Sequence, residues 1–189
     1  MARRAAHQDL RGHLGDPEAH HLRPPAGEEL MKVSALTGDA NYFEDFKVGD
    51  VLRHARGKTI EPLEQVWVTN ITMNTAEGHF NEHAMRGTPW GKRLGFGGVT
   101  ISMVIGLASE DTAENALMEL GLDKIRLKSP VFHGDTLYAY SEVLETRAAD
   151  RPDGGVVRFK HYGVNQDDKV VFEGERTVLL KRRSHWADK

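Results

Sequence analysis

Alternation of apolar and polar residues characterises the second half of the chain. Near its end, Phe172, Val178 and Leu180 fall on one face of an extended segment, which is the period-2 pattern of a strand that buries one side. Similar segments separated by Gly- and Asp-rich turns predict strands at 51–60, 122–128, 136–147, 155–165 and 169–181. We expect the last two strands to form a hairpin, because only a short Asp-containing turn separates them.

A helix is predicted immediately after residue 61. Pro62 suits the first helical position, and Glu64 places a negative charge in the first turn, where the helix dipole favours it. The apolar stripe of this helix consists of Leu63, Val66, Trp67 and Ile71. Extended further, the same stripe reaches Asn74, whose amide must find hydrogen-bond partners if it is buried. Asn74 is therefore the first candidate site residue.

Residues 99–109 contain no charged side chain. A helix that is apolar on every side has to be covered on every side. The β-branched residues of this segment would also suit a buried strand, but its length favours a helix. Several antiparallel strands and one buried helix predict an α+β fold, in which an antiparallel β-sheet is wrapped around a central helix.

The first thirty residues differ from the rest of the chain. They contain four of the ten histidines, many charges and no sustained apolar periodicity. We therefore predict a flexible or non-native extension at 1–40, a folded domain at 41–183 and a tail at 184–189. The adjacent His20 and His21 are interpreted as incidental residues of the extension rather than as a metal tract.

The extension also suggests a hypothesis about the start of translation. Gly27-Glu28-Glu29 is encoded by a purine-rich string that resembles a bacterial ribosome-binding sequence, and it stands just before Met31. Translation would then begin at Met31. The intact mass of the natively expressed protein tests this hypothesis, because a mass that includes residues 1–30 contradicts it.

Composition narrows the classes of function. The chain has 189 residues and no cysteine, which excludes disulfides and thiolate metal sites and is typical of a reducing compartment. A formal net charge of -3 at pH 7 provides no field for nucleic acid or an anionic membrane. The longest uncharged apolar stretch, 99–109, is too short to span a bilayer, which takes about 20 residues. We expect one soluble, cytoplasmic domain without a nucleic-acid or membrane partner.

A glycine-rich segment, Gly95-Phe96-Gly97-Gly98, precedes the uncharged helix. It lacks the third glycine of a dinucleotide fingerprint, and no Lys-Ser/Thr pair follows to make a triphosphate loop. There remain the unpaired N–H groups and the positive dipole end of the helix, which favour an anion or a developing oxyanion near Gly97. A tight turn that uses the conformational freedom of glycine is the alternative.

His79 and His83 have the i, i+4 spacing of a zinc-binding helix. Glu82 directly precedes the second histidine, so the order differs from the His-Glu-x-x-His motif, and we predict no metal site. His79 also follows Asn74 by five residues, and an amide and an imidazole can together hold a water molecule. From spacing alone, an ordinary surface or capping histidine is the alternative.

These segments resemble the MaoC-like dehydratase family, whose pattern is Asp-x-Asn-Pro-x-His, a loop, and Phe-Gly-x-Pro-Ile-x-His-Gly before the central helix. Here the first part corresponds to residues 74–79 and the second to residues 90–97. Residues 131–137 are similar to the Pro-Gly-Asp-Thr-Leu strand entry of the family, and the likeness covers about 41–183. The resemblance implies a hot-dog fold and the activity of an (R)-specific enoyl-CoA hydratase, a hydro-lyase acting on an acyl-CoA thioester.

Departures from the family pattern indicate a subgroup. Asn74 stands in place of the catalytic Asp of the family, Ala76 in place of its Asn, and Phe96 in place of its helix-opening His. This version resembles hydratases of branched C5 dicarboxylic acyl-CoAs, such as mesaconyl-CoA and itaconyl-CoA. The resemblance implies three catalytic residues: His79 as the base, Asn74 as the residue that orients water, and Gly97, whose amide binds the thioester oxygen.

The resemblance also implies a homodimer or dimer of dimers, and no separate cofactor because coenzyme A is part of the substrate. Arg86, Lys92 and Arg93 are candidates for contacting the distal carboxylate, with solvated surface charge as the alternative. Two other functions stay open. A hot-dog acyl-CoA thioesterase generally needs a carboxylate on the central helix, which 99–109 lacks. A non-catalytic acyl-CoA-binding or partner protein is suggested by Asn74.

Overall fold

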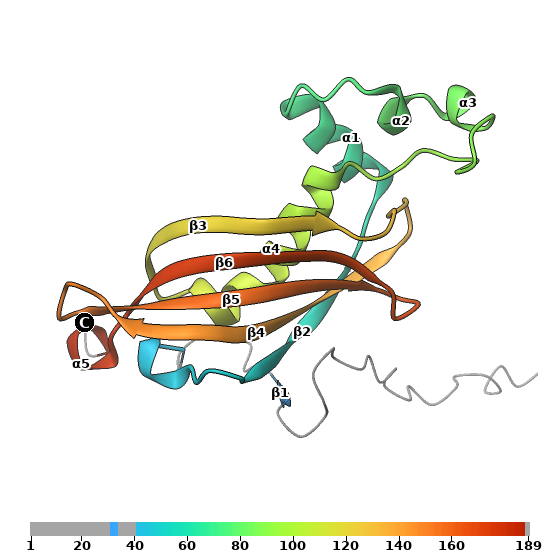
Figure 1. Ribbon diagram of the computed structural model, residues 1–189. Coiled ribbons are helices and arrows are strands. Elements are labelled where there is room, and N and C mark those ends of the chain that lie inside the picture. Colours follow the sequence, from blue (N-terminus) through green and yellow to red (C-terminus); the bar gives the residue numbers. More distant parts are fainter. Residues whose placement is uncertain (1–30, 34–40, 188–189) are drawn as a thin grey trace, which may run out of the picture.

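A six-stranded sheet in the order β1-β2-β4-β5-β6-β3 forms one layer of the molecule (Figure 1). The computed structural model describes residues 31–33 and 41–187. Its strands are β1 (Met31–Val33), β2 (Val51–Thr59), β3 (Ala116–Leu127), β4 (Thr136–Ala148), β5 (Gly154–Asn165) and β6 (Val170–Lys181). Neighbouring strands pair antiparallel, except that β1 runs parallel to β2.

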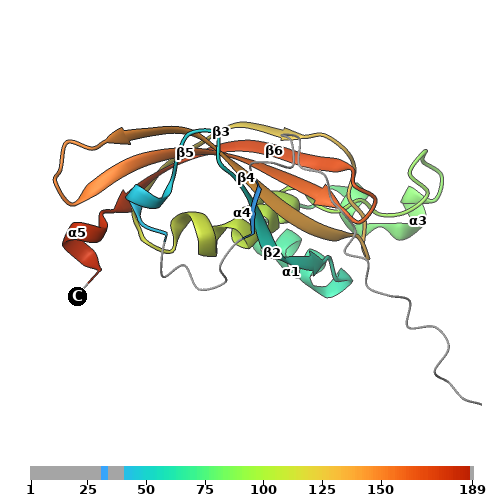
Figure 2. The same ribbon diagram turned by 90° about the horizontal axis from the view of Figure 1, so that it is seen from below.

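Six helical elements accompany the sheet in the described chain, and the longest of them forms the second layer. They are the 3-10 turn η2 (Phe43–Asp45) and the α-helices α1 (Pro62–Ile71), α2 (Glu77–Phe80), α3 (Glu82–Met85), α4 (Gly97–Ala113) and α5 (Arg183–Trp186). The long helix α4 lies along one face of the curved sheet, and α1 lies on the same side (Figure 2). This arrangement confirms the α+β fold class.

Of the six strands observed among the described residues, β1 was not predicted, and the other five match the predicted strands closely except at the start of β3. β3 begins at Ala116 rather than at residue 122. It is an edge strand with mostly exposed residues, so its sequence lacks the clear alternation of a half-buried strand. The predicted hairpin of β5 and β6 is confirmed, and the Asn165 side-chain oxygen accepts hydrogen bonds from the amides of Asp167 (3.1 Å) and Lys169 (3.0 Å) in its turn.

The uncharged segment is the helix α4, as predicted, and the strand alternative is wrong. Val104 and Ala108 are fully buried in the core between α4 and the sheet. Gly163 on β5 permits this close approach, because a Cβ there would lie 2.5 Å from Val104 Cγ2. One detail differs from the expectation of a helix covered on every side: within the described chain, Ser102 and Gly106 on the far side of α4 are exposed.

The helix predicted after residue 61 is α1, which begins at Pro62 as expected. Its orientation reverses the expectation that an apolar stripe faces the core. Leu63, Trp67 and Ile71 are 65%, 63% and 77% exposed, whereas Gln65 and Thr69 are buried. Periodicity identifies the apolar face of a helix, but it does not say which face the rest of the chain covers. The stripe is therefore an open apolar surface in the single chain.

The extension predicted at 1–40 lies outside the described residues, except for Met31–Val33 in β1. The interpretations of His20 and His21 and of the translation start therefore stay predictions. At the other end, the Trp186 indole N–H of α5 donates to the Asp153 carbonyl at 3.1 Å. Within the described part of the chain, no helix is long and apolar enough to cross a membrane.

Candidate active site

A pocket of about 680 Å³ opens at the N-terminal end of α4. Its walls come from the first turns of α4, from the loop at 90–95, and from the residues that end and follow β3. Phe96, Ile101 and Leu127 make most of this lining apolar. Of the three predicted catalytic residues, His79 and Gly97 line this pocket together.

A backbone carbonyl orients the His79 ring. The nitrogen Nδ1 lies 2.9 Å from the Leu94 carbonyl oxygen, which can only accept a hydrogen bond, so we assign the proton to Nδ1. Leu94 is itself fixed, because its amide donates to the Gly78 carbonyl at 2.9 Å. The next amide, of Gly95, donates to the Val131 carbonyl at 2.7 Å. In the neutral ring, Nε2 is then the nitrogen without a proton, which can act as a base.

Gly97 is the first residue of α4, and its amide has no intrahelical acceptor. Neither this amide nor that of Gly98 has an acceptor among the described residues. A Cβ on Gly97 would lie 2.4 Å from Leu127 Cδ1, so a larger residue here would force the Leu127 side chain to move. Two N–H groups at the positive end of a helix, in an apolar pocket, form a site for negative charge.

Asn74 lies away from this pair. It follows Met73, whose backbone is left-handed (φ 57°), and it does not line the pocket. Its side-chain oxygen accepts a hydrogen bond from the Ala76 amide at 3.2 Å, just before α2 begins. Asn74 thus shapes the turn that leads to His79. The water-orienting role stays a prediction.

The two histidines considered for zinc lie on different short helices. His79 is on α2, and His83 is exposed on α3. Among the described residues, no group of three or more His, Asp or Glu side chains is arranged to hold a metal ion.

The cations considered for a distal carboxylate lie outside the pocket lining. Arg93 donates to Glu82 at 3.0 Å, and the Lys92 ammonium lies 4.3 Å from the centre of the Phe132 ring. Within the described lining, the one cationic residue is Lys128, whose ammonium is 3.8 Å from Glu173. The pocket of the single chain therefore shows no dedicated partner for a second carboxylate.

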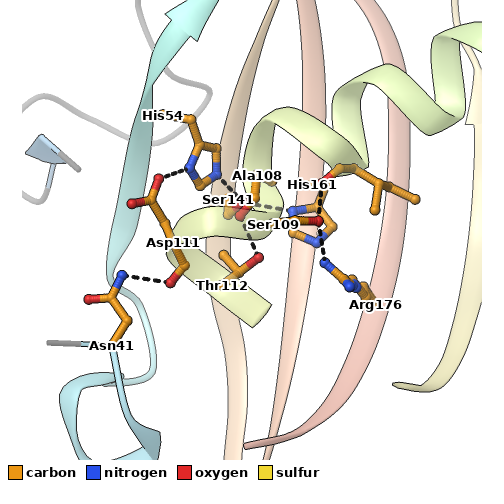
Figure 3. Close-up of polar contacts among 10 residues, drawn as sticks. Asn41, His54, Ala108, Ser109, Asp111, Thr112, Ser141, His161 and Arg176 are labelled. Atoms are coloured by element: carbon orange, nitrogen blue, oxygen red, sulfur yellow. Dashed lines mark hydrogen bonds and ion pairs between the residues drawn. The ribbon is translucent and has the colours of Figure 1, made fainter. Parts of the chain in front are cut away.

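A buried polar cluster at the other end of α4 was not found from the sequence (Figure 3). His54 on β2 donates from Nδ1 to the Asp111 carboxylate on α4 at 2.5 Å. The Ser141 hydroxyl on β4 bridges His54 Nε2 and His161 Nδ1 on β5, at 2.6 Å each. The order Asp-His-Ser resembles a hydrolase triad, but such a triad is recognised by its geometry and by access to substrate. No local sequence pattern indicates this cluster, because its residues are far apart in the chain.

Access excludes catalysis by this cluster in the described structure. Ser141 is fully buried, and the pocket between β2 and α4 is lined by Asp111 but not by Ser141. Burial is the main cause that lowers the pKa of His161 to about 3, and the nearby His54 and Arg176 lower it further. The cluster therefore ties the C-terminal half of α4 to three strands of the sheet.

Comparison with known proteins places the chain in a family. A family model described as mesaconyl-CoA hydratase matches residues 2–182. The chain belongs to the mesaconyl-CoA hydratase family. One curated relative, the β-methylmalyl-CoA dehydratase of Chloroflexus aurantiacus, is 35% identical over 165 residues, which cover 79% of this chain and 47% of that protein.

Solved structures confirm the hot-dog fold of this mesaconyl-CoA hydratase family member. A MaoC domain protein dehydratase from Chloroflexus aurantiacus aligns with a TM-score of 0.71 and 32% identity, over 76% of this chain and 45% of that chain. A Mycobacterium tuberculosis protein with a double hotdog fold aligns with a TM-score of 0.69 and 22% identity, over 78% of this chain and 46% of that chain. The chain spans about half the length of the curated relatives it matches.

Proposed function

We propose that this protein is a hydro-lyase that reversibly adds water across the 2,3 double bond of a short enoyl-CoA thioester. The observation that carries the proposal is the pocket that His79 and the open amides of α4 share. An imidazole can take and return a proton near neutral pH, and the amides can bind an oxygen on which negative charge develops. The family and the Chloroflexus aurantiacus relative carry names of the same reaction class.

In the hydration direction, Nε2 of His79 removes a proton from water while the water oxygen forms a bond to carbon 3. The π electrons of the double bond move toward the thioester, whose carbonyl oxygen gains charge and accepts a hydrogen bond from the Gly97 amide. Protonated His79 then returns its proton to carbon 2, which regenerates the base. No carboxylate lines the described pocket, so we assign both proton transfers to His79.

For the substrate, we propose a branched C5 dicarboxylic acyl-CoA of the mesaconyl or itaconyl type. The description of the family supports this choice, and the largely apolar lining suits a short acyl chain. Coenzyme A is part of this substrate, and the proposed steps use no separate cofactor. We place the reaction in the cytoplasm, because a cysteine-free chain is typical of a reducing compartment.

Incubation of the full chain with mesaconyl-, itaconyl- and crotonyl-CoA tests the proposal. Mass spectrometry is expected to show the gain of one water by at least one of the C5 thioesters. Release of free coenzyme A would instead indicate a thioesterase, which the absence of a carboxylate from the described lining disfavours. Binding without any product would indicate a non-catalytic acyl-CoA-binding protein.

We further propose that the protein forms a homodimer along β3. This edge strand has 12 residues, and its exposed apolar side chains are Met118, Leu120, Leu122, Ile125 and Leu127. The open N–H and C=O groups of such an edge pair readily with another strand. An exposed apolar strand of this length is therefore the expected contact for a second copy.

Other features of the chain support a second hot-dog unit at this edge. The uncovered side of α4 carries the small residues Ser102 and Gly106, which permit close packing of another helix. Leu127 at the end of β3 also lines the catalytic pocket, so a second copy at β3 would border the site. The double hotdog fold of the Mycobacterium tuberculosis protein provides a precedent for two adjacent units. The exposed stripe of α1 offers a further contact for a dimer of dimers.

A further inference from the structure

Thr100 is a polar residue of the pocket wall to which neither the sequence pattern nor the family resemblance assigns a role. It lies in the first turn of α4, it is 2% exposed, and it lines the same pocket as His79 and Gly97. A hydroxyl in an apolar wall costs stability unless it finds a hydrogen-bond partner in the protein, in water or in a ligand. The role of Thr100 therefore depends on which group its hydroxyl can bind in the pocket.

The Thr100 hydroxyl is unusual because it has no hydrogen-bond partner among the described residues. Four other hydroxyls, on α4, on α1 and at the C-cap of α1, bond to the carbonyl one turn earlier, as threonine and serine commonly do in helices. The residues that do so are Thr69, Thr72, Ser109 and Thr112, and Figure 3 shows the bond from Thr112 to Ala108. Thr100 does not make this bond, and its oxygen is not among the sealed polar atoms of the interior.

Helix geometry places the Thr100 side chain on the same face of α4 as Gly97. Thr100 follows Gly97 by three residues, so the two share one face of α4. Helical side chains lean toward the N-terminus and cover the preceding turn. The Thr100 side chain therefore projects over the turn that begins with the open amides of Gly97 and Gly98.

We propose that the Thr100 hydroxyl is a second donor to the thioester oxygen, acting together with the Gly97 amide. This inference rests on the proposed hydratase function and adds a catalytic residue to it. The hydroxyl keeps its proton throughout and strengthens its hydrogen bond as charge gathers on the oxygen. A donor held free in a site of low dielectric is already oriented for the transition state, so no protein bond has to break when the substrate binds.

Two substitutions separate a hydrogen-bonding role from a packing role. Thr100→Val keeps the shape and removes the hydroxyl, whereas Thr100→Ser keeps the hydroxyl and removes a methyl group. On the enoyl-CoA that the wild type hydrates, we expect kcat to fall about 10- to 100-fold in Thr100→Val, with KM changed less. Thr100→Ser is expected to stay within about threefold of the wild type. If Thr100 only packs, the order reverses, and a valine variant with wild-type kcat overturns the proposal.

The absorption spectrum of a bound thioester tests the hydrogen bond from Thr100 independently of turnover. Hexadienoyl-CoA has a conjugated thioester whose absorption band shifts to the red when hydrogen bonds polarise its carbonyl. Mixed with each protein and read before turnover, it is expected to show a red shift with the wild type and Thr100→Ser, and a smaller one with Thr100→Val. If no enoyl-CoA is hydrated but this pattern holds, the proposed function fails and the role of Thr100 stands. Equal shifts in all three proteins, or none in the wild type, contradict the role of Thr100.

Discussion

At the scale of single residues, one backbone carbonyl decides the chemistry of His79. The ring is a candidate base from the sequence, but the sequence does not say which nitrogen carries the proton. The carbonyl of Leu94, 15 residues later, accepts from Nδ1 and leaves Nε2 free. Asn74 shows the opposite outcome, because its side chain bonds to the Ala76 amide and lies off the pocket lining. The sequence pattern predicts that Asn74 and His79 act together, but their local hydrogen bonds place only His79 in the pocket lining.

Replacing His79 with alanine is expected to slow hydration at least a hundredfold, because a positioned general base contributes about 10²- to 10⁴-fold. The assay is the loss of enoyl thioester absorbance with the substrate that the wild type turns over. His83→Ala is the matched control, since this histidine is exposed on α3 and should leave the rate unchanged. Turnover by His79→Ala at a rate close to that of the wild type contradicts the assigned base.

His161 is expected to make the stability of the fold depend on pH. Burial lowers its pKa from 6.5 to about 3. The unfolded chain binds a proton below pH 6.5, but the folded chain does so only near pH 3, so stability falls as the pH decreases through this window. Between pH 6.5 and 5, this group should remove about 2 kcal/mol from the free energy of unfolding.

The variant His161→Asn checks this expectation, because asparagine offers Ser141 a hydrogen-bonding group and does not titrate. Urea unfolding of both proteins at pH 7 and pH 5 gives the two free energies. The variant is expected to lose less stability than the wild type on acidification. Parallel losses would show that His161 does not contribute to the pH dependence.

At the scale of elements, the start of α4 brings an anion site and a close strand contact to one residue. Phe96 enters the helix with extended backbone, and Gly97 then opens the first turn against Leu127. The sequence reveals the glycine-rich helix start, and the tight turn was its alternative explanation. In the structure the Gly97 amide has no acceptor among the described residues, and Gly97 does not have a positive φ, so the conformational freedom of glycine does not explain this residue.

Gly97→Pro removes this amide N–H while preserving the helix. Proline is favoured at the first helical position, and Phe96 already has the backbone that precedes proline (φ -65°, ψ 128°). Both Gly97→Pro and its control Gly97→Ala are made with Leu127→Ala, because a Cβ at residue 97 would lie 2.4 Å from Leu127 Cδ1. The proline variant is expected to have a kcat about 10² to 10³ times lower than the alanine variant. Equal kcat values would exclude this amide as the donor.

At the scale of the whole molecule, the apolar surfaces that one chain leaves open point to assembly. The edge strand β3, the far side of α4 and the stripe of α1 all carry exposed apolar or small residues. The sequence predicted a strand or a helix at each of these places. Their exposure could not, because it depends on which other elements fold against them.

Leu120→Lys is expected to break the proposed dimer, because a lysine on an edge strand opposes pairing with another strand. Light scattering after size exclusion should give the wild type twice the mass of one chain and the variant the mass of one. Val48→Lys is the control, as this exposed residue lies in the turn before β2, and β4, β5 and β6 separate β2 from β3 in the sheet. A wild type with the mass of one chain contradicts the dimer.

The sequence by itself determined most of the strands, the central helix and two residues of the pocket, because periodicity, helix-start signals and a family pattern are local. Only the tertiary structure decided the tautomer of His79, the place of Asn74 and the orientation of α1. It also produced the cluster that spans His54 and His161, and it left the Thr100 hydroxyl in the pocket wall without a partner among the described residues. These features depend on contacts between residues far apart in the chain, which no local pattern specifies.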